Sequence, residues 1–359
     1  MIAVLFGTRP EFIKLAPILH ELKLEKIPFI LIHSGQHYSP KLDQEIIKDL
    51  KLPRPNYNLK VGSGSQAKQT GKIMIGVEEI LEKVKPKILV VHGDTNTMLA
   101  GSLAAKKLHI AVAHIEAGLR SFDNGMPEEI NRIITDKISD LLFTPTKITK
   151  KNLLKDGIDE KRIFITGNTI VDAVLSSLPL TETSPILKHL GLEKNNYVLV
   201  TAHRVANVNK ASRLKELVSL LNFTSKLLGK KIIWPMHPHT RKQLLKNKIK
   251  LNSDLQILNP TNYRDMLSLI KFAFLILTDS GGIQEEAYIL KKWLITLRNT
   301  TERPETLTAN FLVDLDKNKL KKAILAFQNK QVLWKENIYG VGNSSKLIVK
   351  HLKNYLYEK

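Results

Sequence analysis

The feature that most restricts the fold of this chain is a repeated order of elements: a short apolar run, then polar or glycine residues, then a helical pattern. The clearest apolar runs are residues 2–6, 88–91, 197–200 and 274–277. Strands and helices that alternate in this way are typical of α/β proteins with parallel sheets. Ligands of such sheets bind outside the carboxyl ends of the strands, so the residues after each run are the first candidates for a functional site.

The length of the chain favours two domains. It has 359 residues, which is more than a single hydrophobic core usually serves. Residues 178–184, with Pro179 inside them and Pro185 after them, have the composition of a linker, and a second run that starts with a strand begins near Tyr197. We therefore expect two Rossmann-like domains with a boundary at about residues 170–190. The predicted domains are residues 1–170 and 171–344.

The charge is strongly positive. The formal net charge is +21, and the sequence pI is near 9.8. Aromatic residues are not interleaved with the lysine clusters, such as those at 147–155 and 242–250, as a surface that stacks nucleic-acid bases would require. A solvated, lysine-rich surface is therefore favoured over a specific nucleic-acid partner. A positive field would still attract an anionic nucleotide.

Cysteine is absent, which excludes disulfides, thiolate metal sites and cysteine nucleophiles. The first residues lack the basic start and small-residue cleavage site of a signal peptide. No apolar run approaches the length that spans a bilayer. We expect a cytoplasmic protein that does not insert into a membrane.

The first apolar run leads into Gly7-Thr8-Arg9-Pro10-Glu11. Thr8 and Glu11 have the spacing of a capping box, and proline suits a first helical turn. Arg9 and Lys14 would stand near the helix N-terminus, where anions already bind well. A well-capped surface helix explains the same residues. A G-x-G-x-x-G motif is absent, so the sequence does not support a nicotinamide or flavin cofactor.

The last of the four runs leads into Ser280-Gly281-Gly282. Two glycines at the start of a helix let backbone N–H groups approach a phosphate closely, which favours a diphosphate site over a plain capped turn. Glu286 follows one turn later and could hold ribose hydroxyls. The loop 298–305, which contains Arg298 and Arg303, follows an apparent strand and is a weaker candidate.

Carboxylates mark three neighbouring positions in the first half. Asp94 and Glu116 each follow a strand, and Glu128 and Glu129 open a helix whose apolar face carries isoleucines 130, 133 and 134. Acids in a first turn also complement the helix dipole, which is the simpler explanation for Glu128 and Glu129. Several carboxylates in one pocket would instead provide acid/base groups near neutral pH.

Two histidines follow strands of the second half, His203 and His237. A lone histidine is more often structural, but two at equivalent strand ends favour phosphate binding or protonation of a leaving group. The histidines are far apart in sequence and no H-x-x-x-H pair stands among the motifs, so we expect no metal site.

Taken together, these motifs resemble the non-hydrolysing UDP-N-acetylglucosamine 2-epimerase family along essentially the whole chain. Nine segments carry the resemblance in the family's order: 6–11 with Lys14, 34–37, 92–95, 114–120, 127–132, 166–169, 201–204, 279–286 and 301–305.

The resemblance implies two Rossmann-like domains in a glycosyltransferase-B-like arrangement, with the active site in the cleft between them. It also implies a C-terminal helix, about 345–359, that crosses back to the first domain, and a homodimer. The implied enzyme is an isomerase that interconverts UDP-GlcNAc and UDP-ManNAc without a cofactor, by elimination and re-addition of UDP through a 2-acetamidoglucal, for cell-surface polysaccharide or glycan synthesis.

The resemblance also assigns roles residue by residue. The implied catalytic residues are Asp94, Glu116, Glu128, His203 and Lys14. The implied substrate-binding and UDP-binding residues are Arg9, His237, Ser280, Gly281, Gly282, Glu286 and Arg303.

One departure from the family pattern stands at Val205-Ala206, where many relatives have a glutamate before Asn207. The loop from Glu116 to Glu128 is also shorter than in many bacterial relatives, which can carry a regulatory UDP-GlcNAc site. Gln36, His37 and Gln69 lie where such a site would be, but we do not predict one for this chain. Alternative functions are a 2-epimerase of a UDP-diacetamido-uronic acid, a hydrolysing epimerase that releases ManNAc, a glycosyltransferase of the same fold, and a basic nucleic-acid-binding protein.

Overall fold

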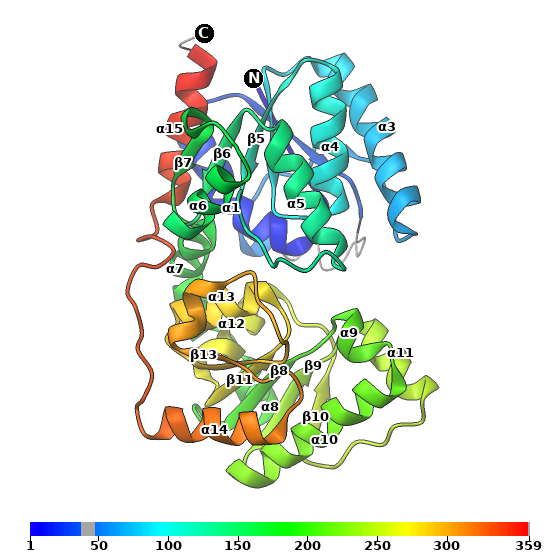
Figure 1. Cartoon of the computed structure of the whole chain (residues 1–359), viewed down its shortest axis with the longest axis vertical. Coiled ribbons are helices and arrows are strands. Elements are labelled where there is room, and N and C mark those ends of the chain that lie inside the picture. The colour runs from blue at the N-terminus through cyan, green and yellow to red at the C-terminus, as the bar shows by residue number, and fades with distance from the viewer. Residues whose placement is uncertain (37–46, 358–359) are drawn as a thin grey trace. The chain divides into compact units, whose positions relative to one another are not determined.

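The computed structural model describes residues 1–36 and 47–357, and His37 lies outside them (Figure 1). Contacts along the chain form two compact units. Unit 1 comprises Met1–Ser176 and Asn337–Lys359, and unit 2 comprises Ser177–Glu336.

Unit 1 is built on a parallel sheet that has seven strands among the described residues, in the order β3-β2-β1-β4-β5-β6-β7. The central strands are buried along their whole length, as expected for a sheet with helices on both faces. The strands are β1 (Ile2–Phe6), β2 (Phe29–His33), β3 (Tyr57–Asn58), β4 (Ile88–His92), β5 (Ala111–Ile115), β6 (Leu141–Thr144) and β7 (Ile163–Ile165). The helices are α1 (Arg9–Leu24), α3 (Gln66–Val84), α4 (Asn96–Lys107), α5 (Pro127–Ile138), α6 (Lys147–Lys155), the 3₁₀ turn Glu160–Arg162, α7 (Thr169–Glu182), whose last turns belong to unit 2, and α15 (Ser344–Tyr357).

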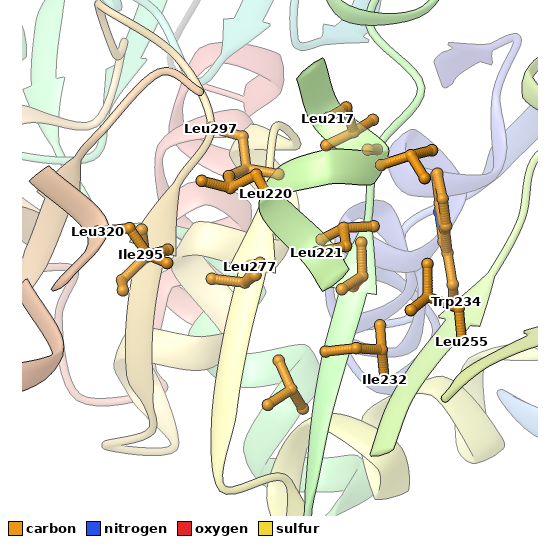
Figure 2. Packing of buried hydrophobic residues seen from close by; sticks show 14 of the residues in the cluster. Leu217, Leu220, Leu221, Ile232, Trp234, Leu255, Leu277, Ile295, Leu297 and Leu320 are labelled. Atoms are coloured by element: carbon orange, nitrogen blue, oxygen red, sulfur yellow. The ribbon is translucent and has the colours of Figure 1, made fainter. Parts of the chain in front are cut away.

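Unit 2 repeats this plan, and its described part contains a six-stranded parallel sheet in the order β10-β9-β8-β11-β12-β13. Its core packs α10 and α14 against the sheet through residues such as Leu220, Trp234 and Leu320 (Figure 2). The strands are β8 (Tyr197–Thr201), β9 (Lys231–Pro235), β10 (Leu255–Leu258), β11 (Leu275–Thr278), β12 (Trp293–Thr296) and β13 (Asn310–Leu312). The helices are α8 (Ile186–Leu190), α9 (Val205–Val208), α10 (Ala211–Leu228), α11 (Pro238–Lys246), α12 (Tyr263–Phe272), α13 (Gly281–Ile289), the 3₁₀ helix Pro304–Thr308 and α14 (Lys317–Gln328).

Both sheets reverse their direction of growth after the third strand. In unit 1 the chain returns to place β4 beside β1, and in unit 2 it returns to place β11 beside β8. The sheet of unit 2 thus has the 3-2-1-4-5-6 order of a Rossmann fold, and the sheet of unit 1 has the same order with a seventh strand added. Ligands of such sheets bind at the switch point, outside the carboxyl ends of the two central strands. The prediction of an α/β protein with two Rossmann-like sheets is confirmed.

The linker predicted at 178–184 is wrong for most of its length, because α7 continues to Glu182 with Pro179 inside it. Proline removes one helical hydrogen bond, but Ser177 and Thr181 on either side of it are buried. Packing of the flanking turns outweighs the local preference of proline, and the division between the units falls inside this helix.

Helix α5 has its apolar side outside, although an amphipathic helix usually buries that side. Ile130, Ile133 and Ile134 are 51%, 40% and 36% exposed, whereas Glu129 and Arg132 are buried. Arg132 forms ion pairs with Glu129 and with Asp94 of a neighbouring loop. These pairs offset the free-energy cost of burying the charges.

The C-terminal helix α15 belongs to unit 1 and packs against α1. Its N-terminus is held by Asp172 of α7, whose carboxylate accepts hydrogen bonds from the N–H of Ser344 at 3.2 Å and of Ser345 at 2.9 Å. In the described part of the chain, no helix is both long and apolar enough to cross a membrane.

Candidate functional site

Hydrogen bonds to Glu11 connect the loops after β1 and β4 at the switch point of unit 1. The predicted capping box is present: Glu11 accepts hydrogen bonds from the N–H groups of Gly7 and Thr8, both at 2.7 Å. The same carboxyl group accepts a hydrogen bond from the Thr95 hydroxyl at 2.6 Å. Burial raises the pKa of Glu11 to about 7, against the opposing effect of these hydrogen bonds. Arg9, the first residue of α1, is half-buried beside this junction.

A buried ion pair lies at the same end of the sheet. Lys14 Nζ of α1 is 2.5 Å from Glu116 Oε1, and both side chains are almost fully buried. Asn168, after β7, donates a hydrogen bond to the same oxygen at 2.7 Å. Glu116 has a φ of +68°, a left-handed conformation that is uncommon for a residue other than glycine. Such backbone strain is retained only where surrounding contacts impose it, and it is concentrated at functional sites.

His92 stands beside this pair and was not assigned a role from the sequence. It ends β4, and its Nε2 atom is 3.8 Å from Glu116 Oε2. Neither ring nitrogen has a hydrogen-bond partner among the described residues. Burial lowers the pKa of His92 to about 4 despite the nearby Glu116 carboxylate. The imidazole is therefore neutral near pH 7. Its position at the carboxyl end of a buried strand is the signal that could have singled it out.

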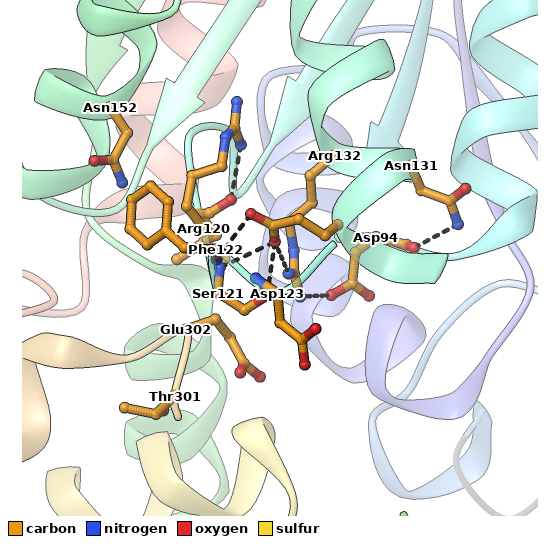
Figure 3. Close-up of polar contacts among 12 residues, drawn as sticks. Asp94, Arg120, Ser121, Phe122, Asp123, Asn131, Arg132, Asn152, Thr301 and Glu302 are labelled. Carbon is orange, nitrogen blue, oxygen red and sulfur yellow. Dashed lines mark hydrogen bonds and ion pairs between the residues drawn. The ribbon is translucent and has the colours of Figure 1, made fainter. Parts of the chain in front are cut away.

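Asp94 and the first turn of α5 form a second cluster (Figure 3). Asp94 is half-buried and forms an ion pair with Arg132. Glu129 is buried and accepts hydrogen bonds from the Ser121 N–H and hydroxyl, both at 2.9 Å. Its neighbour Glu128 is half-buried. The two adjacent acids thus have different environments: Glu129 holds a loop, and Glu128 is the more accessible.

In unit 2, a fully buried carboxylate at the switch point organises the loop after β8. Asp279 accepts hydrogen bonds from the His203 N–H at 3.0 and 3.1 Å, the Arg204 N–H at 2.9 Å and the Asn207 side-chain amide at 3.1 Å. The His203 ring Nδ1 is 3.4 Å from the same carboxylate. The ring of His237 lies beside it, with the ring centroids 6.1 Å apart. The structure therefore brings the two predicted histidines together.

The predicted diphosphate motif lies at the N-terminus of α13, with Ser280 as the N-cap. A Cβ atom added at Gly281 would clash with Glu302 Oε1, so a side chain there would displace the carboxylate of the buried Glu302. A Cβ atom at Gly282 would meet only the Ser280 hydroxyl, at 4.0 Å. No packing within the described protein requires the second glycine, so it leaves space beside the backbone at this helix N-terminus.

The other predicted residues of unit 2 lie in the interior behind this motif. Arg303 is buried, and its Nε is 2.5 Å from Glu285 Oε1. Glu286 is also buried, close to Tyr263 of α12. Burial and then the Glu286 carboxylate raise the pKa of the Tyr263 hydroxyl, which keeps it protonated. Arg298 forms an ion pair with Glu302 at 2.8 Å.

The altered segment at Val205-Ala206 and the glutamines Gln36 and Gln69 lie within well-ordered surroundings of their own units. Val205 and Ala206 are exposed on α9, while Asn207 is buried and also donates to the Leu297 carbonyl at 3.0 Å. Gln36 accepts hydrogen bonds from Thr97, and Gln69 donates to the Gly62 carbonyl at 2.8 Å. Both glutamine side chains are thus engaged inside unit 1.

Comparison with known proteins places this geometry in a family. A family model described as UDP-N-acetylglucosamine 2-epimerase matches residues 20–353. The chain is 49% identical to the UDP-N-acetylglucosamine 2-epimerase of Methanocaldococcus jannaschii, over 98% of both chains. It is 36% identical to the UDP-2,3-diacetamido-2,3-dideoxy-D-glucuronate 2-epimerase of Pseudomonas aeruginosa, over 98% of this chain and 99% of the relative.

Solved structures agree with the sequence comparisons. The crystal structure of the M. jannaschii UDP-GlcNAc 2-epimerase in complex with UDP-GlcNAc and UDP matches with a TM-score of 0.93 and 48% identity, covering 98% of this chain and 99% of that chain. The resemblance predicted from the nine motifs is confirmed: this chain belongs to the UDP-N-acetylglucosamine 2-epimerase family.

Proposed function

We propose that the protein interconverts UDP-GlcNAc and UDP-ManNAc without hydrolysis, by elimination and re-addition of UDP, and so supplies cell-surface polysaccharide or glycan synthesis. The observation that carries this proposal is the set of functional groups gathered at the two switch points. The first holds acids and a buried lysine, Lys14 with Glu116 and Asp94 nearby, and the second holds two histidines and a glycine-containing helix N-terminus.

The chemistry explains why both kinds of group are needed. The proton on C2 of the sugar is not acidic, so a base removes it only as the C1–O bond breaks and UDP departs. The products are 2-acetamidoglucal and UDP. Protonation of C2 from the opposite face, with a new bond from the UDP oxygen to C1, then gives the epimer. Two acid/base groups and a site that stabilises the departing diphosphate are sufficient for both directions.

Asp94, Glu116 and Glu128 are the proposed acid/base groups, with Lys14 as the partner of Glu116. The contact of 2.5 Å between Lys14 and Glu116 supports a role at the reacting atoms, because the ion pair holds the carboxylate in a fixed position. The left-handed backbone of Glu116 is consistent with a side chain held in a required direction.

Unit 2 is proposed to hold UDP. The backbone at Ser280, Gly281 and Gly282 would bind the diphosphate, aided by the helix dipole of α13. His203 and His237 are proposed to stabilise the charge on the departing phosphate. Arg9 is proposed to bind substrate as well. Glu286 would hold the ribose. We propose that Arg303 binds substrate. Because it is buried against Glu285, we propose that it also fixes the conformation of its loop.

Incubation of the protein with UDP-GlcNAc in D2O, followed by NMR, tests the proposal. The expected result is deuterium at C2 together with a mixture of UDP-GlcNAc and UDP-ManNAc. Accumulation of free ManNAc with UDP would indicate a hydrolysing enzyme. Turnover of a UDP-diacetamido-uronic acid with no exchange in UDP-GlcNAc would refute the substrate assignment, and the P. aeruginosa relative makes this the control substrate to include.

We also propose that the protein forms a homodimer through the exposed isoleucines of α5. Exposed apolar residues that line one helix face are typical of protein interfaces. Ile134→Asp should give a monomer in light scattering after size-exclusion chromatography. Leu245→Asp, a change at an exposed leucine on α11 of unit 2, is the matched control and should leave the molecular mass unchanged. A wild-type protein that elutes as a monomer would refute this proposal.

A further inference from the structure

Helix α5 holds Asp94 at two points (Figure 3). Arg132 forms an ion pair with the Asp94 carboxylate. The preceding residue, Asn131, donates a hydrogen bond from its side-chain amide to the Asp94 backbone carbonyl at 2.9 Å and another to Asn96 Oδ1 at 3.3 Å. Two consecutive residues of one helix therefore fix both the backbone and the side chain of this aspartate.

The burial of the pair is unequal. The Arg132 side chain is 1% exposed, whereas the Asp94 side chain is 31% exposed. Arg132 NH1 is also 2.8 Å from Glu129 Oε2, and Glu129 is 2% exposed. Glu129 already compensates the buried positive charge within the interior, so neutralisation alone does not require Asp94. The second arm of the guanidinium fork, directed at a half-exposed carboxylate, instead sets the position of that carboxylate.

Glu129 in turn is fixed by the loop before α5. It accepts hydrogen bonds from Ser121, through both the N–H and the hydroxyl at 2.9 Å, and from the Phe122 N–H at 3.1 Å. Phe122 has a φ of +57°, a conformation that is an outlier for a bulky residue. The contacts to Glu129 hold this loop, and through it they hold the orientation of Arg132.

We propose that Arg132 is a positioning residue for Asp94 and that Glu129 fixes Arg132. This inference rests on the proposed function, in which Asp94 transfers a proton. The aspartate must then keep its productive position to within about 0.5 Å, because a larger displacement disrupts proton transfer. Arg132 sets the direction of the carboxylate, and the rest of the buried network keeps the guanidinium from rotating. In this role Arg132 acts through Asp94 rather than on the substrate.

The test is replacement of Arg132 by alanine with chemical rescue. R132A should lower kcat for epimerisation by about 100-fold, the size of effect that a misplacement of about 1 Å produces. The Kd of UDP, measured by calorimetry, should change by less than about threefold, since an interaction used only in the chemical step leaves ground-state binding intact. Millimolar guanidinium should restore part of kcat in R132A, and urea, which is neutral and similar in shape, should not.

Two further variants keep the test decisive if R132A folds poorly. R132K keeps the charge but replaces the fork with a single ammonium, so kcat should fall with UDP affinity retained. E129Q should show the same pattern more weakly. K106A is the control, because Lys106 forms an ion pair with Asp140 at 3.0 Å and neither residue bonds Asp94, Glu129 or the loop that holds Glu129. It should lower Tm but keep kcat at temperatures where it is folded.

The outcomes separate this inference from the proposed function. If the wild-type protein does not epimerise UDP-GlcNAc, the proposed function fails, and the variants are then compared on the uronic-acid substrate. If the wild type is active and folded R132A and R132K retain its kcat, the positioning role is refuted. Loss of kcat with an equal loss of UDP affinity, or rescue by urea as well as guanidinium, would also refute it.

Discussion

Adjacent glycines at the N-terminus of α13 should respond in opposite ways to the same substitution. A Cβ atom at Gly281 would lie 2.3 Å from Glu302 Oε1, which is closer than side-chain atoms approach one another. A Cβ atom at Gly282 meets only Ser280 Oγ, at 4.0 Å. Gly281→Ala therefore tests the packing inside the protein, and Gly282→Ala tests whether a ligand approaches the backbone at this helix N-terminus.

The cost at Gly281 follows from the contacts of Glu302. That side chain is 3% exposed and is held by Arg298 at 2.8 Å, so its carboxylate cannot move aside freely. Overpacking and weakening of a buried ion pair together cost about 3–4 kcal/mol, and the better helix propensity of alanine offsets about 1 kcal/mol. The net loss of about 2–3 kcal/mol should lower Tm by about 5–10 °C for a unit of this size.

Gly282→Ala should leave Tm unchanged or raise it slightly, because no atom of the described residues opposes the methyl group and the helix gains propensity. If the diphosphate approaches the backbone here, the same methyl group should weaken UDP binding by at least about tenfold, equivalent to about 1.4 kcal/mol. Thermal unfolding without ligand and calorimetry with UDP measure the two effects. Unchanged UDP affinity in Gly282→Ala would refute the proposed anchor, and an unchanged Tm in Gly281→Ala would refute the packing argument.

Three other predictions concern single buried groups. Burial lowers the pKa of His92 to about 4, so between pH 6.5 and 4 the unfolded chain binds a proton that folded His92 does not, and stability falls as pH falls. His92 should lower the free energy of unfolding by about 2 kcal/mol between pH 7 and 5. His92→Gln should lack this part of the pH dependence in urea unfolding, and a pH dependence identical to that of the wild type would contradict the assignment. Asp279→Asn should weaken UDP binding and lower kcat because His203 loses its anchor, and wild-type values in both assays would exclude this role. Asp172→Ala should lower the unfolding free energy by about 2 kcal/mol, as it leaves the start of α15 without its acceptor; an unchanged urea midpoint would show that Ser345 finds another partner.

Local patterns in the sequence were sufficient for the elements that form the two switch points. The runs before Gly7 and Ser280 are buried strands, and the capping box of Thr8 and Glu11 is present. These features depend on a few consecutive residues, where periodicity, caps and glycine have direct physical consequences. The same patterns were misleading around Pro179, where contacts from distant parts of the chain keep the helix intact.

The motifs were enough to predict the family, the parallel α/β class and the positions at which acids, histidines and glycines follow strands. Which of these side chains meet was not predictable from them and depends on the folded chain. Glu128 and Glu129 are neighbours in the chain, yet burial made Glu129 the partner of Arg132, and His92 came to lie beside the Lys14–Glu116 pair. Such roles depend on contacts between strand ends far apart in sequence, and on the burial that those contacts create, and neither is encoded in the spacing of a single motif.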